Sequence, residues 1–82
     1  MTATSEQSAA TPEELRARIE AGIDGAKAHV SGDGHHFKAF VYAPAFTGIS
    51  RLAQHKLVYD VFGDEIGRRI HALSIKTRTT EN

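Results

Sequence analysis

Cysteine is absent from the 82 residues of this sequence. Its absence excludes a disulfide, a thiol nucleophile, a CxxC redox pair, and a zinc or iron–sulfur site built only from cysteines of this chain. It also fits a reducing compartment. The N-terminus has neither the basic region nor the apolar core of a signal peptide, and no apolar run is long enough to span a bilayer. We therefore expect a cytoplasmic protein that does not enter membranes.

The sequence also lacks an excess of charge, because ten Lys and Arg residues balance ten Asp and Glu residues. A protein dedicated to binding nucleic acid usually has a basic excess, since its affinity comes largely from neutralising phosphates. The balance argues against that class but leaves room for a local basic patch. Five histidines are many for this length, and histidine is the residue best suited to carry chemistry in such a chain.

The length allows a single domain. Residues 1–10 contain no large apolar residue after Met1, so they cannot bury enough surface to offset the entropy of ordering them. We predict a disordered tail there and one folded domain over residues 11–82. That domain is near the lower size limit for folding without disulfides, and we expect the isolated chain to be a monomer.

The first half of the domain predicts a helix followed by a β-hairpin. Thr11 as N-cap, Pro12 at the first helical position and Glu14 three residues after the cap indicate a helix from Pro12 to about Asp24. Residues 26–31 alternate between small or apolar and polar, which is typical of a strand. A Gly-Asp-Gly turn and an aromatic, β-branched segment over residues 36–42 complete the hairpin.

The second half predicts two more helices and a third strand. Ser50 can cap a helix that runs to about Phe62, with Leu57 on its apolar face. Asp64 can cap a short helix over residues 65–69, and residues 71–77 alternate as a strand. The order αββααβ predicts an α+β fold with helices covering one face of a three-stranded mixed sheet. The sheet is mixed because the hairpin is antiparallel and the third strand follows a helical crossover.

Four segments, in the same order, resemble those of BolA-like proteins. Residues 30–37 (VSGDGHHF) resemble the family's Gly-rich hairpin turn before a His-Phe pair, and residues 46–48 (FTG) resemble its aromatic-x-Gly step. Residues 51–59 (RLAQHKLVY) are similar to its long helix, and residues 70–75 (IHALSI) to its His-Ala-Leu strand. The compact turn resembles the short-loop subgroup, although the Thr-Pro-x-x-Trp ending common in the family is missing.

The resemblance implies a fold related to the type II KH domain and a binding function. It implies partnership with a monothiol glutaredoxin and a [2Fe–2S] cluster shared between the two proteins. We therefore expect an adaptor in iron–sulfur trafficking or iron homeostasis rather than an enzyme. The alternative is a nucleic-acid-binding transcriptional regulator, since some members are described as binding DNA.

The same resemblance selects the cluster ligands. The glutaredoxin would contribute a cysteine and a bound glutathione a second thiolate, so a cysteine-free partner can offer only histidine nitrogen. His71 is the first candidate by its position in the family pattern. His36 is the second because it occupies the His-Phe position, and His35, nearer the turn, is its alternative. With so few ligands, the isolated chain is not expected to hold the cluster.

Three other readings of the residues remain. Arg51, His55 and Lys56 predict a basic helical face that could dock an acidic partner or a phosphate backbone. A zinc site formed by His35, His36 and His71 is conceivable, though adjacent histidines rarely share one metal. Enzyme chemistry has little support, because the Asp in the Gly-Asp-Gly segment is explained by a turn without any role in an active site. We therefore expect no catalytic residue. The basic face could extend to Arg68, Arg69, Lys76 and Arg78.

Overall fold

The computed structural model describes residues 10–80. Their order of elements is α1 (Pro12–Gly22), β1 (Lys27–Gly32), β2 (His36–Tyr42), η1 (Pro44–Phe46), α2 (Arg51–Phe62), η2 (Gly63–Glu65) and β3 (Ala72–Arg78), in which η1 and η2 are 3₁₀ turns. The disordered tail predicted for residues 1–10 lies outside the described residues except at Ala10, which is buried in the core. The packed domain therefore includes Ala10, ahead of the predicted boundary.

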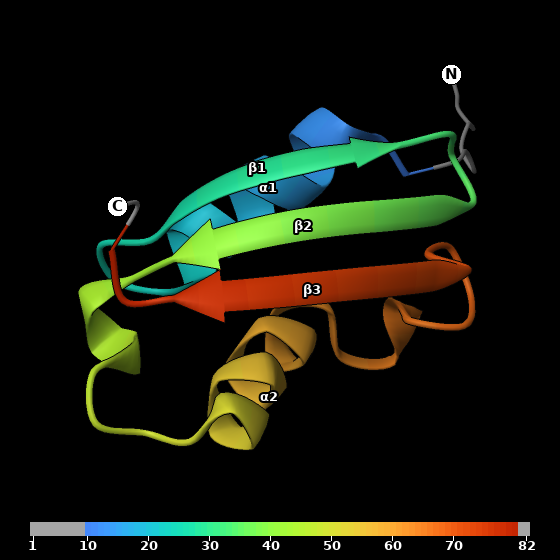
Figure 1. Ribbon diagram of the computed structural model, residues 1–82. Helices are drawn as coiled ribbons and strands as arrows, with labels where there is room; N and C mark the ends of the chain where they lie inside the picture. The colour runs from blue at the N-terminus through green and yellow to red at the C-terminus, as the bar shows by residue number, and fades with distance from the viewer. Residues whose placement is uncertain (1–9, 81–82) are drawn as a thin grey trace.

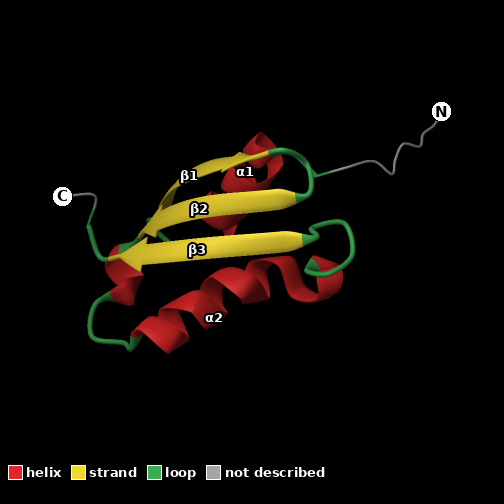
Figure 2. Cartoon of the chain, turned by 45° about the vertical axis from the view of Figure 1, so that its right-hand side comes forward, coloured by secondary structure: helices red, strands yellow, loops and turns green. Residues whose placement is uncertain are grey.

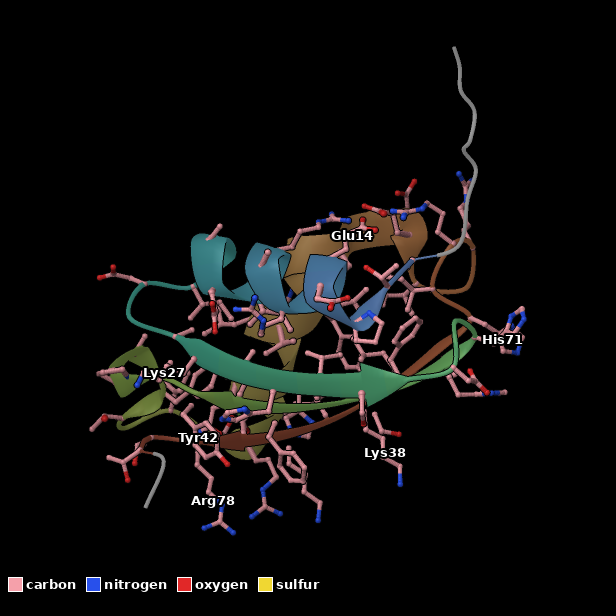
Figure 3. The ribbon with its side chains drawn as sticks, turned by 90° about the horizontal axis from the view of Figure 1, so that it is seen from above. Glu14, Lys27, Lys38, Tyr42, His71 and Arg78 are labelled. Carbon is pink, nitrogen blue, oxygen red and sulfur yellow. The ribbon has the colours of Figure 1, made fainter. Side chains whose placement is uncertain are left out.

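The strand β2 is the centre of the sheet, whose order is β1-β2-β3. It pairs antiparallel with β1, so that Lys27 lies opposite Tyr42, and parallel with β3, so that His36 lies opposite Ala72. Figures 1 and 2 show the three strands side by side, and Figure 3 shows both helices on the same side of them. The predicted α+β fold, with a mixed sheet covered on one face, is confirmed.

Burial alternates along the strands, as it must in a sheet with one covered face. In β2, Phe37 is 2% exposed and Val41 is fully buried, whereas Lys38 and Phe40 are exposed on the other face. The helices add Leu15, Ile19, Val58 and Phe62 to the core, and the remaining buried residues come from the strands and turns: Ala10, Ile23, Ala28, Ala39, Ala43, Phe46, Ile70, Leu73 and Ile75.

Both helices begin where the sequence predicts. The hydroxyls of Thr11 and Ser50 each accept a backbone N–H three residues further on, at 3.1 Å. Each cap thus satisfies a donor that the first helical turn leaves unpaired. The end of α1 comes at Gly22 rather than at Asp24, because Ile23 adopts an extended backbone and packs into the core. No helix within residues 10–80 has the length and apolar content needed to cross a bilayer.

The predicted third helix over residues 65–69 is wrong. The helical segment here is the single turn η2, and Gly67 has a φ of +87°, which a right-handed helix does not accommodate. The N–H of Gly67 instead donates to the carbonyl of Ile70 at 2.6 Å, and a β-bridge joins Ile66 to Ile70. This compact turn buries Ile70 completely and leads directly to residue 71.

The predicted apolar face of α2 is correct only in part. Val58 and Phe62 are buried, but Leu57 is 40% exposed. Successive helical residues are rotated by about 100°, so the helix cannot turn both Leu57 and Val58 to the sheet. Tyr59 packs at the margin, where its hydroxyl donates to the carbonyl of Leu73 at 3.0 Å and fastens α2 to β3.

Candidate functional site

Two histidines from separate segments meet at one end of the sheet. His36 begins β2, and His71 immediately precedes β3, whose first residue pairs with His36. Their ring centroids are 5.3 Å apart, and the ring planes are inclined by 87°. Both residues are exposed, and Figure 3 shows His71 at the end of the sheet where the β1–β2 hairpin turns. The parallel register therefore creates a paired-imidazole surface from residues 35 positions apart in the sequence.

The hairpin turn positions His36 through Asp33. One carboxylate oxygen of Asp33 accepts the backbone N–H groups of His35 and His36, both at 2.9 Å. The hydrogen bond from His36, followed by that from His35, lowers the pKa of Asp33 below its ordinary value, so this side chain is an anion at neutral pH. Its other oxygen lies 4.0 Å from Nδ1 of His36, within the range of an ion pair.

Glycine is required at position 32 of the same turn. A Cβ added to Gly32 would lie 2.6 Å from the carbonyl oxygen of His36 and 2.5 Å from Cδ1 of Phe37. Both distances are below any normal carbon contact, and the ring of Phe37 is itself fixed in the core. The close approach of the two hairpin strands at this point therefore depends on the missing side chain.

His35 contributes to the site through its backbone. Its N–H bonds to Asp33, and its carbonyl accepts the N–H of Ala72 at 3.0 Å. These two bonds tie the hairpin turn to the first residue of β3, while the imidazole that contacts His71 belongs to His36. The sequence left the choice between His35 and His36 open, and the geometry favours His36.

A four-residue ionic network holds the turn that precedes His71. Arg18 of α1 donates to both carboxylate oxygens of Glu65, at 2.9 and 2.6 Å. Arg69 donates to Glu65 at 2.8 Å and to both oxygens of Glu14, at 2.8 and 2.7 Å. This network could not be predicted from local sequence patterns, because its partners lie 47 and 55 positions apart.

The network lowers the pKa values of its two carboxylates. The hydrogen bonds from Arg18, and then those from Arg69, lower the pKa of Glu65 to about 2. Arg69 likewise lowers the pKa of Glu14. Glu65 therefore remains charged well into the acid range, and its bonds to Arg18 continue to hold the turn before His71 against α1 under those conditions.

The paired imidazoles fit a shared metal site. Two imidazoles bound to one tetrahedral metal have ring centroids about 5 Å apart, close to the 5.3 Å between His36 and His71. Within residues 10–80, however, no three His, Asp or Glu side chains are placed so that they could hold one metal ion. The conceivable zinc site of His35, His36 and His71 is thus not formed.

The basic helical face is divided by the structure. Arg51 and His55 turn toward β3 and line a shallow groove with Thr77. Nε2 of His55 is buried there and has no hydrogen-bond partner among the described residues. Lys56 lies apart from this groove and pairs with Asp60 at 3.2 Å. The three residues do not lie on one continuous surface, because a helix separates adjacent positions 55 and 56 by about 100°, and their role in docking remains a prediction.

The four basic residues that could extend this face also differ in their surroundings. Arg69 is held by two carboxylates and Arg68 lies 3.9 Å from Asp64, so neither adds much positive potential. Lys76 and Arg78, in contrast, line the groove beside Arg51. The cations available to an anionic partner are those of β3 rather than those of the turn.

The structure is a small α+β domain with two histidines paired at one exposed end of its sheet. The sequence model of the family described as BolA-like protein matches residues 7–82. The chain therefore belongs to the BolA-like protein family, as its hairpin, helix and strand motifs predicted.

Individual relatives agree with this assignment. Human BolA-like protein 1 is 37% identical over 73 residues, which cover 89% of this chain and 51% of the relative. The DNA-binding transcriptional regulator BolA of Vibrio cholerae is 42% identical over 50 residues, covering 61% of this chain and 47% of the relative. The chain thus spans about half the length of these curated relatives.

A solved structure supports the fold directly. The bolA protein homologue from Coxiella burnetii is 41% identical and superposes with a TM-score of 0.77. The match covers 85% of this chain and 91% of the other. The arrangement of strands and helices that brings His36 to His71 is therefore the family's fold.

Proposed function

We propose that this protein is an adaptor that binds a monothiol glutaredoxin and completes the ligand set of a [2Fe–2S] cluster held between them. The observation that carries the proposal is the pairing of the His36 and His71 rings, 5.3 Å apart on an exposed edge. The role is one of binding rather than catalysis, and it belongs to cytoplasmic iron–sulfur trafficking or iron homeostasis.

The ligand count explains why a partner is needed. A [2Fe–2S] cluster requires four protein or thiol ligands, and imidazoles can replace thiolates at one of its irons. This chain contributes two nitrogens, from His71 and His36, and has no cysteine to supply the rest. Two thiolates must therefore come from outside, which a glutaredoxin with its bound glutathione would provide.

Each residue of the site has a distinct task in this proposal. His71 and His36 present their ring nitrogens to the cluster, and Asp33 holds the turn beside His36 by accepting the backbone N–H groups of His35 and His36. The Arg18–Glu65 pair keeps the turn before His71 in place. The cluster, when bound, supplies electron-transfer and iron–sulfur-transfer chemistry.

Nucleic-acid binding is the second candidate function. It is favoured by the name of the Vibrio cholerae relative, a DNA-binding transcriptional regulator, and by the groove that Arg51 and His55 form with β3. Duplex DNA bound in this groove should lose affinity steeply with salt, and Arg51→Ala should reduce that dependence. The pairing of Lys56 with Asp60 leaves fewer cations for this role than the sequence suggested.

The test of the adaptor function is a titration into cluster-loaded monothiol glutaredoxin, followed by visible circular dichroism. The wild type should reshape the cluster spectrum, and His71→Ala should not. His29→Ala is the matched control, because His29 is another exposed histidine, placed on β1 away from the pair. An unchanged spectrum with the wild type, or full activity of His71→Ala, would overturn the proposal.

A further inference from the structure

The face of the sheet away from the helices carries positive charge only. None of the three strands contains Asp or Glu, but together they carry Lys27, Lys38, Lys76 and Arg78 on the open face. Figure 3 shows Lys38 and Arg78 pointing away from the helices, while Glu14 lies on the opposite side of the sheet. The overall neutrality of the chain therefore conceals two faces of different charge.

Among the described residues, the cations of the open face have no carboxylate partner. Within residues 10–80, Lys27, Lys38, Lys76 and Arg78 contact no carboxylate. Of the basic residues on the helical side, Arg51 has no ion pair within residues 10–80, and the other five are paired: Arg16 with Glu20, Arg18 with Glu14 and Glu65, Lys56 with Asp60, Arg68 with Asp64, and Arg69 with Glu14 and Glu65. The positive potential of the open sheet face is thus not cancelled locally.

Two aromatic side chains, Phe40 and Tyr42, lie on the central strand of this face. Phe40 is 44% exposed and lies in register between His29 on β1 and Lys76 on β3. The ammonium group of Lys76 is 5.9 Å from the centroid of the Phe40 ring. Tyr42 follows on the same strand and the same face, in register between Lys27 and Arg78.

Rings flanked by cations match the chemistry of a single nucleic-acid strand. Proteins bind such strands by stacking unpaired bases on aromatic side chains and by neutralising the phosphates on either side. Phe40 and Tyr42 are two residues apart on one face, a spacing of about 7 Å along the strand. A duplex would leave these rings unused because its bases are already stacked, and an acidic protein would need the cations but not the rings.

We propose that this open sheet face, defined by Lys27, Lys38, Phe40, Tyr42, Lys76 and Arg78, binds single-stranded RNA. Bases stack on Phe40 and Tyr42, and the lysines and Arg78 contact phosphates. Ser31 and Ser74 lie in register on either side of Lys38, where their hydroxyls can bond to ribose 2′-hydroxyl groups. The proposal is independent of the glutaredoxin function, because the rings lie farther along β2 than His36.

The test is fluorescence anisotropy of a labelled, uridine-rich RNA of about 12 nucleotides, titrated with the full chain at several salt concentrations. Contacts to four phosphates predict a slope of log affinity against log salt of about −3, and Lys38→Ala or Lys76→Ala should each reduce its magnitude by about 0.7. Phe40→Ala should weaken binding by roughly five- to 150-fold. Arg16→Ala, which removes the same charge from α1 on the helical side, should leave affinity and slope unchanged.

A second variant separates stacking from electrostatic attraction. Phe40→Trp keeps an aromatic surface and introduces a single tryptophan into a chain that has none. It should bind RNA as tightly as the wild type, and its fluorescence should be quenched as the bases stack. Unquenched fluorescence, or equal losses for Arg16→Ala and Lys38→Ala, would overturn the proposal.

The choice of RNA is tested with two further probes. DNA of the same sequence should bind more weakly than the RNA because it lacks the 2′-hydroxyl groups, and the corresponding RNA duplex should bind more weakly and without quenching. Equal or tighter binding of the DNA strand would overturn the assignment to RNA. Circular dichroism melting of each variant shows that a lost affinity does not result from lost folding.

Discussion

The two histidines of the site stand on turns of different construction. The turn that presents His36 is held by Asp33, which accepts backbone hydrogen bonds from residues two and three positions away. The turn that presents His71 is held by Glu65, whose carboxylate bonds to Arg18 across 47 positions. The first turn can form as soon as the hairpin forms, whereas the second requires α1 to be docked on the folded sheet.

This difference determines which half of the site is vulnerable. Loosening the contact between α1 and the turn before His71 should displace His71 while the hairpin keeps His36 in place. Adding a side chain inside the hairpin turn should instead disturb the sheet, because β2, the second strand of the hairpin, is the central strand of the sheet. The paired imidazoles therefore depend on one interaction that is local and one that is long-range.

The largest effect is expected from Gly32→Ala. The new methyl group would meet the carbonyl of His36 and the buried ring of Phe37 at 2.6 and 2.5 Å. Relieving the overlap requires a shift of backbone or core, so the variant should be less stable by about 2–3 kcal/mol. Urea unfolding followed by far-UV circular dichroism measures the change.

Gly34→Ala is the matched control for this crowding. Gly34 has a φ of +99° but no atom within 4 Å of an added Cβ, so the substitution introduces backbone strain without a clash. We expect a loss of only about 1–2 kcal/mol. Equal stability of Gly32→Ala and wild type would show that the two hairpin strands can separate freely, contrary to the local construction described above.

Glu65→Gln should have the next largest effect, because it weakens the long-range turn. The substitution leaves Arg18 and Arg69 without their shared carboxylate. Since the Glu65 side chain is 27% exposed, solvent screens part of the interaction, and we expect a loss of about 1–2 kcal/mol at neutral pH. Asp60→Asn, which removes a carboxylate from the exposed pair with Lys56, should cost less than about 0.5 kcal/mol.

The pH dependence sharpens this test. The pKa of Glu65 falls from 4.5 to about 2 on folding, so its charged form stabilises the protein above pH 4.5. That contribution decreases as the pH falls from 4.5 toward 2, because the unfolded chain then takes up the proton first. The free energy of unfolding of wild type and Glu65→Gln should converge over this range, and a constant difference would exclude the proposed role of the charge.

The same distinction explains what could be predicted from the sequence. The caps at Thr11 and Ser50, the bounds of β2 and the hairpin turn follow from residues within a few positions of each other. The third helix was predicted wrongly because the left-handed φ of Gly67 and the burial of Ile70 depend on packing against the rest of the chain. A short segment that looks helical by propensity can be overridden in this way.

The sequence could predict which residues form the site, but it could not predict how they are arranged in space. The resemblance selected His71 and His36, but their adjacency depends on the parallel register of β2 and β3. The inward turn of His55 depends on how α2 is rotated against β3. The basic open face could not be predicted from the net charge, because net charge is a sum over the chain and does not show which face each charge occupies.

The smallest effect on stability, and the sharpest test of the hairpin half of the site, is expected from His35→Ala compared with His36→Ala. Both side chains are exposed, so each variant should remain within about 0.5 kcal/mol of the wild type. In the cluster titration, His36→Ala should diminish the spectral change, because it removes the ring beside His71. His35→Ala should leave the spectrum as in the wild type, since alanine retains the backbone bonds to Asp33 and Ala72. The reverse result would mean that the hairpin turn rearranges when the partner binds, and that its local construction is less rigid than the bonds to Asp33 suggest.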